Sequence, residues 1–111
     1  MSSNTNRFIA TGNLTRDPET NHTASGTTVC NFTIANNLPV PNKEEKVSFF
    51  NCVTWGKTAE TCGKYLKKGS KVCVDGHLEQ SNYTAGDGSK RSVYQIQAER
   101  VEFLTPYRED A

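Results

Sequence analysis

The cysteines and histidines are the residues of this sequence with the widest chemistry, because thiolates and imidazoles bind zinc and paired thiols form disulfides. The four cysteines are Cys30, Cys52, Cys62 and Cys73. No two of them form a Cys-x-x-Cys pair and the two histidines, His22 and His77, stand far apart, so the spacing predicts no zinc site. The polar start of the sequence has no signal-peptide core, and we therefore expect free thiols packed as small apolar side chains in a reducing cytosol.

Groups that could catalyse a reaction are equally sparse. The carboxylates are scattered, no Ser-His-Asp set is suggested, and no glycine-rich loop opens a helix to hold a phosphate. The 13 basic and 12 acidic residues leave a net charge of +1, which excludes a nucleic-acid binder that relies on bulk positive charge. No apolar run approaches the roughly 18 residues of a membrane span. The sequence thus predicts a cytoplasmic protein that is not an enzyme and uses no metal, cofactor or membrane.

The elements that position the side chains are mostly strands. Alternating polarity predicts five of them, over residues 7–15, 27–37, 46–55, 71–79 and 92–104, with a polar loop over 17–26. Gly12 indicates a bulge or a close backbone approach, the segment 85–89 indicates a hairpin turn, and a change of parity indicates a bulge near Glu99 or Arg100. Apolar steps of three and four predict one short helix between Thr58, its N-cap, and Gly69, its C-terminal cap.

This order of elements limits the fold. Three strands, one helix and two strands over about 100 residues suit an all-β, five-stranded antiparallel Greek-key barrel (the OB-fold) with a short helix between the third and fourth strands. A β-sandwich with one helix fits nearly as well. We expect residues 1–104 to form this single domain and residues 105–111 to be a short, disordered polar tail.

Three motifs, in order, add a family resemblance. They are Gly-Asn-Leu-Thr-Arg-Asp-Pro-Glu at 12–19, Trp-Gly-Lys-x-Ala-Glu at 55–60 with Tyr-Leu-Lys-Lys-Gly-Ser at 65–70, and Asp-Gly-His-Leu at 75–78. Together they resemble bacterial single-stranded DNA-binding proteins over about residues 5 to 104. The resemblance implies an OB-fold, usually a homotetramer, that binds single-stranded DNA without sequence preference in replication, recombination and repair. It also implies a location at the bacterial nucleoid or replication fork.

Binding a strand without reading its sequence needs aromatic rings for the bases and dispersed positive charge for the phosphates. The resemblance places the stacking role on Phe49, Trp55 and Tyr83. Phe49 and Trp55 share one face of their predicted strand, six residues apart, and burial in the core is the alternative for both. Phe50 lies on the opposite face and resembles a subunit-interface position, with core packing as an equal alternative.

Six basic residues are candidates for phosphate contacts, and an ordinary solvated surface charge is the alternative for each. They are Lys57, Lys68, Lys90 and Arg91, together with Lys43 and Arg16. The chain is nearly neutral, so we expect base stacking to supply more of the affinity for DNA than in a more basic relative. We also expect that affinity to depend less on salt concentration.

The sequence also departs from the family pattern. Val40 stands where many relatives carry a tryptophan, and Glu79-Gln80-Ser81-Asn82 stands where a basic segment is common, so we expect a lower affinity. The chain ends at Arg108-Glu109-Asp110-Ala111 without the acidic tip that recruits partners, as in a shortened chain or a short phage, plasmid or competence-type relative. We therefore expect no partner docking through that tip. The other function considered is an OB-fold protein-interaction module of a primosome or repair complex.

Overall fold

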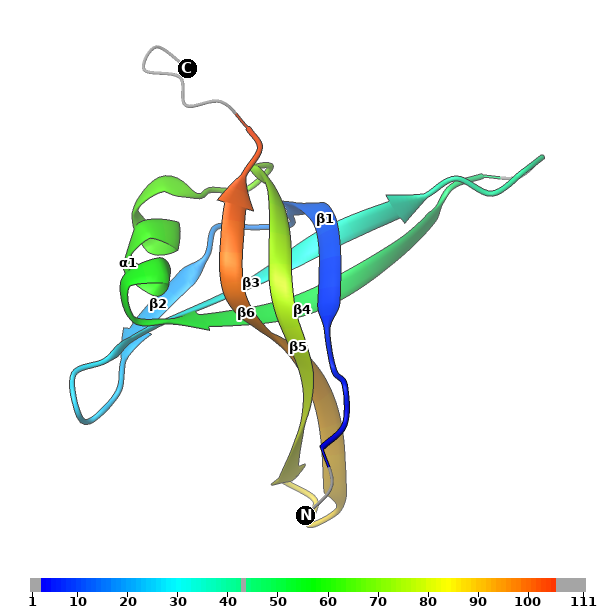
Figure 1. The fold of residues 1–111 in the computed structure, drawn as a ribbon. Helices are drawn as coiled ribbons and strands as arrows, with labels where there is room; N and C mark the ends of the chain where they lie inside the picture. The colour runs from blue at the N-terminus through cyan, green and yellow to red at the C-terminus, as the bar shows by residue number, and fades with distance from the viewer. Residues whose placement is uncertain (1–2, 43, 106–111) are drawn as a thin grey trace.

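Strands dominate the computed structural model, which describes residues 3–42 and 44–105 (Figure 1). In chain order the elements are β1 (Phe8–Leu14), β2 (Glu19–His22), β3 (Thr28–Leu38), β4 (Lys46–Trp55), α1 (Gly56–Tyr65), β5 (Lys71–Thr84) and β6 (Lys90–Phe103). Four of the five predicted strands are found within three residues of their expected bounds. The fourth predicted strand, β5, runs five residues further, to Thr84.

Five strands form a ring. The sheet order is β1-β5-β6-β4-β3, and β1 pairs with β3 to close it. Closure occurs where Asn13 and Leu14 pair with Ala35 and Ile34. Gly12 permits it, because a Cβ at that position would lie 2.6 Å from the backbone oxygen of Ala35. The predicted close approach at Gly12 is therefore confirmed, and the closed ring bears out the OB-fold in preference to a β-sandwich.

Two strand predictions need correction. Residues 19–22 lie in the segment predicted to be a loop, but they form β2, which pairs with β3 at the edge of the ring. The pairing is also not wholly antiparallel, because β4 and β6 run parallel where Cys52 and Val53 face Ile96 and Gln97. The four exposed residues of β2 carry no apolar alternation, which explains why the pattern missed them.

The bounds of the helix were predicted wrongly as well. Gly56, with a φ of 64°, turns the chain from β4 directly into α1, so Trp55 is the N-cap and Thr58 caps nothing. The helix ends at Tyr65, and the N–H of Leu66 donates to the carbonyl of Cys62. Gly69 follows later, in a turn where its N–H donates to the carbonyl of Leu14, so it is not the C-terminal cap.

The core fills the ring beneath α1. It is lined by one face of each long strand and by the inner side of the helix: Leu14, Cys30, Phe32, Ile34, Cys52, Ala59, Cys62, Leu66, Val72, Val74, Ile96 and Ala98. All four cysteines are free, and three of them are fully buried. Burial raises the pKa of the Cys52 and Cys62 thiols to about 12, so both stay protonated and pack as small apolar groups.

Two long hairpins leave the ring as arms, one from β3 and β4 and one from β5 and β6 (Figure 1). The β5–β6 arm turns through residues 85–89, where the N–H of Ala85 donates to the carbonyl of Ser89, as the turn signal predicted. Nearer the ring, Gly76 faces Ala98 and Asp75 faces Arg100, which leaves Glu99 as the predicted bulge. At the far end of β6, the N–H of Thr105 donates to the carbonyl of Lys71, and the rest of the predicted tail, 106–111, lies outside the described residues.

Candidate functional site

Two large aromatic side chains are exposed on the outer face of β4. Phe49 is 65% exposed and Trp55 is 50% exposed. Because they are six residues apart on one strand, both rings project to the same side of the sheet. Their partners on β3 are Ala35 and Val29, which are too small to cover the rings. Neither ring belongs to the core, whereas Val53, on the same face between them, is buried.

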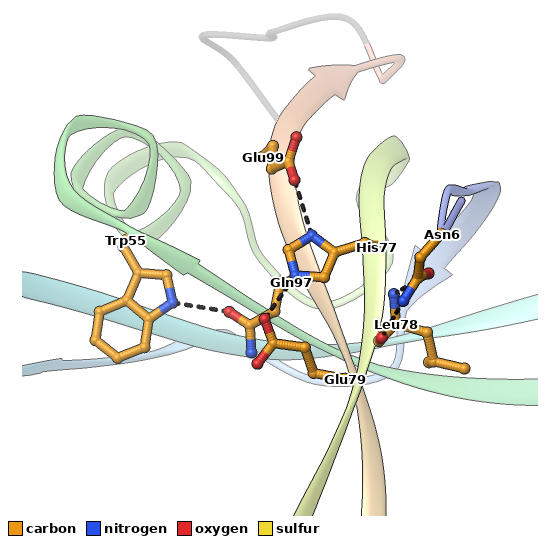
Figure 2. Close-up of polar contacts among 7 residues, drawn as sticks. All are labelled: Asn6, Trp55, His77, Leu78, Glu79, Gln97 and Glu99. Carbon is orange, nitrogen blue, oxygen red and sulfur yellow. Dashed lines mark hydrogen bonds and ion pairs between the residues drawn. The ribbon is translucent and has the colours of Figure 1, made fainter. Parts of the chain in front are cut away.

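The indole of Trp55 is held from the neighbouring strand. Its Nε1–H donates to Oε1 of Gln97 at 3.0 Å, and the two side chains point toward each other in Figure 2. The contact exists because β6 runs parallel to β4 and places Gln97 opposite Val53. Gln97 was not among the predicted site residues. Only the pairing of β4 with β6 identifies Gln97 as a neighbour of Trp55, and the sequence pattern within either strand does not predict that pairing.

Arg16 reaches the same outer face from the loop after β1. It lines a hollow of about 130 Å³ together with Thr33, Asn51 and Gln95. The hydroxyl of Thr33 donates to Oδ1 of Asn51 at 3.0 Å. This hydrogen bond orders the polar surface between Phe49 and Trp55 on β4. The guanidinium of Arg16 is exposed, and its ion pair with Glu19 is long, at 4.0 Å, so its charge remains available.

The β5–β6 arm brings together an aromatic ring and a cation. Tyr83 is 50% exposed and lies directly opposite Arg91, so the two side chains project from the same face of the arm. Arg91 is oriented by Ser89, whose Oγ accepts from Nε at 3.1 Å, and by Asp87 at 3.7 Å. Lys90 has the opposite parity and projects from the other face. The predicted group at this arm therefore divides, with Tyr83 and Arg91 on one side and Lys90 on the other.

The remaining basic candidates are spread around α1. Lys57 is exposed in the first turn and lines a hollow of about 350 Å³ with Arg100, a cation that was not predicted. Lys68 is exposed after the helix, where its backbone N–H donates to Oδ1 of Asp17 at 2.8 Å. Lys43 lies outside the described residues.

Phe50 occupies the inner side of β4. It is half-buried against the core, and its ring meets the edge of Phe8 with centroids 5.2 Å apart at 81°. This contact agrees with the core-packing alternative for Phe50 and leaves part of the ring accessible. Its interface role stays a prediction.

A cluster of His77, Glu79 and Glu99 borders Gln97 (Figure 2). Nδ1 of His77 lies 2.8 Å from Glu99, and Nε2 lies 2.5 Å from Glu79. A neutral imidazole carries one N–H, so both hydrogen bonds require the protonated ring. The bonds to Glu79 and then Glu99 accordingly raise the pKa of His77. Glu79, one of the departures from the family pattern, is thus paired with the imidazole of His77.

Two classes of site are absent from the parts of the chain that the structure describes. Within residues 3–42 and 44–105, no three His, Cys, Asp or Glu side chains gather in a way that could hold a metal ion. The one helix found there is too short and too polar to cross a membrane. What the described surface offers instead is exposed aromatic rings with dispersed cations.

Comparison with known proteins agrees with this surface. The profile of the single-strand binding protein family matches residues 5–104. A single-stranded DNA-binding protein of Halalkalibacterium halodurans is 45% identical over 103 residues, which cover 91% of this chain and 61% of that protein. Single-stranded DNA-binding protein A of Bacillus subtilis is 44% identical, with 91% and 60% covered, and single-stranded DNA-binding protein 2 of Listeria monocytogenes is 42% identical, with 91% and 64% covered. The chain therefore spans about three fifths of the length of these curated relatives.

Proposed function

The chain belongs to the single-strand binding protein family, and from this premise we propose that it binds single-stranded DNA without sequence preference. The proposal covers a protective role in replication, recombination and repair, with no catalytic activity. It places the protein in the cytoplasm, at the bacterial nucleoid or the replication fork.

One observation carries the proposal: Phe49 and Trp55 expose their rings on one face of β4. An exposed ring costs free energy in water, and it regains that energy when a base stacks on it. A duplex keeps its bases stacked on one another, whereas a single strand offers them to the protein. The β4 face therefore favours single strands over duplexes without reading sequence.

Phosphate contacts complete the mechanism. We propose that Arg16 contacts the strand beside Phe49 and Trp55, and that Arg91 contacts it beside Tyr83 on the β5–β6 arm. Lys57, Lys68, Lys90 and Lys43 are the further candidates for phosphate contacts. Each contact that forms releases counterions and steepens the dependence of log affinity on log salt by about 0.7. With a net charge of +1, we expect few such contacts and a shallow slope.

The test is the fluorescence anisotropy of labelled oligo-dT, titrated with the protein at several salt concentrations and compared with a duplex of the same length. We expect binding of oligo-dT, weak binding of the duplex, and a slope reduced by about 0.7 in Arg91→Ala. Lys64→Ala is the matched control, because it removes one charge from the last turn of α1. Equal binding of both DNAs would reject the preference for single strands. No binding of oligo-dT at low salt would reject DNA binding in favour of a protein-interaction module.

We also propose that the protein acts as a homotetramer, with the accessible part of the Phe50 ring at a subunit interface. Light scattering should then give roughly four times the chain mass of 12.3 kDa. A mass of one chain would reject the tetramer. Phe50→Ala would then change only stability, through its contact with Phe8.

A further inference from the structure

We propose that Gln97 is a positioning residue, which holds the indole of Trp55 ready to receive a base. This inference rests on the proposed function of the β4 face. It starts from the geometry of the pair, in which the donor-only indole Nε1–H is 3.0 Å from Oε1 of Gln97. Because the indole has no acceptor, the amide of Gln97 must present its oxygen, and this requirement fixes the orientation of the amide group.

Trp55 needs such a partner because the backbone alone does not fix its ring. It is the last residue of β4, and Gly56 turns the chain away immediately after it. Half of the residue is exposed, and its partner on β3, Val29, covers little of it. A ring in this position, without an anchor, would sample several rotamers. The hydrogen bond selects one of them.

Gln97 is suited to the task because it is itself immobilised. It lies in β6 between two paired strands, opposite His77 of β5 on one side and Val53 of β4 on the other. Its side chain is half-buried, and its neighbours in the strand, Ile96 and Ala98, are buried in the core. Gln97 therefore transfers the rigidity of the closed ring to a side chain on its outer surface.

The consequence for binding is preorganisation. Ordering a flexible side chain on binding costs affinity, and a ring that is already ordered avoids that loss. Gln97 then raises affinity through Trp55 rather than by contacting DNA. Loss of the acceptor in Gln97→Met should weaken oligo-dT binding between about twofold and tenfold.

The first test uses the free protein. Trp55 is the only tryptophan, so time-resolved fluorescence anisotropy reports on this ring alone. We expect a larger subnanosecond loss of anisotropy in Gln97→Met than in the wild type, and recovery in Gln97→Glu, which retains an acceptor oxygen. Slow hydrogen exchange of the indole N–H in the wild type checks the same bond without a substitution. Equal anisotropy decays, or an indole N–H that exchanges freely, would overturn the proposal.

The second test is a double-mutant cycle with labelled oligo-dT. Trp55→Phe keeps an aromatic ring but removes the N–H, so Gln97→Met should have no further effect in that background. A persistent loss there would show that Gln97 acts by another route and would overturn the positioning role. Failure of the wild type to bind oligo-dT would overturn the proposed function as well, whereas normal binding with unchanged anisotropy decay would overturn the role of Gln97 alone.

Discussion

Removing Phe49 and Trp55, singly and together, perturbs the proposed stacking surface most directly. The two residues are six positions apart on β4, which at about 3.3 Å per residue separates them by about 20 Å. A single base cannot cover both rings at that distance. Truncation of one stacking ring costs about 1–3 kcal/mol in this class of protein. Because sites more than about 7–10 Å apart act independently, Phe49→Ala and Trp55→Ala should sum to about 2–6 kcal/mol in the double variant.

The two single effects should also differ. Phe49 is the more exposed ring, but Trp55 has the larger aromatic surface and is anchored by Gln97. We therefore expect the larger loss from Trp55→Ala. Both residues are exposed, so stability should change by less than about 0.5 kcal/mol, and the loss of affinity will not reflect unfolding.

The assay is anisotropy of labelled oligo-dT at one fixed salt concentration, with circular dichroism to confirm the fold. Tyr65→Ala is the matched control, because Tyr65 at the end of α1 is 52% exposed, close to the 50% of Trp55, but does not lie on β4. Its removal should leave affinity unchanged. If Tyr65→Ala costs as much as Trp55→Ala, or if the double variant binds as tightly as a single variant, the stacking argument is refuted.

Two further predictions concern stability. Gly12→Ala should lower the free energy of unfolding by about 1–3 kcal/mol in urea, because its Cβ would lie 2.6 Å from the backbone oxygen of Ala35 at the closure of the ring, whereas Gly86→Ala, in open space, should not. The raised pKa of His77 implies stabilisation that is complete below the unfolded value of 6.5 and is lost as pH rises through the folded value. The thermal midpoint should therefore fall over that range in the wild type but not in His77→Gln. A folded pKa at or below 6.5, measured by NMR, would contradict the pairing of this imidazole with its two carboxylates.

The alternation of polar and apolar residues was sufficient to predict the strands in which one face is buried and the other is exposed. The alternation in residues 46–55 placed Phe49 and Trp55 on one face and Phe50 on the other, as observed. The change of parity in the last strand indicated a bulge near Glu99 or Arg100, and the strand register places it at Glu99. Gly12 indicated a bulge or a close backbone approach, and the structure shows the close approach, to Ala35. The alternation and the change of parity depend on residues close in sequence, so the sequence of one chain is enough to predict them.

Pairing between distant strands could not be predicted in the same way. The contact of Trp55 with Gln97 needs β6 beside β4 in parallel register, and no periodicity in either strand specifies its neighbour. The ion pair of His77 with Glu99 likewise joins two strands, β5 and β6, that are brought together only by the fold. The positions of the rings proposed to stack on bases were therefore predictable, but the side chains that hold their surroundings in place were not.

The intrinsic fluorescence of Trp55, titrated with oligo-dT, measures the proposed binding surface most directly, because this single tryptophan lies on it. We expect strong quenching by oligo-dT as a base stacks on the indole, and little change with duplex DNA. Oligo-dT binding that leaves the emission of Trp55 unchanged would show that DNA does not occupy the outer face of β4. Equal quenching by the duplex would contradict the preference for single strands.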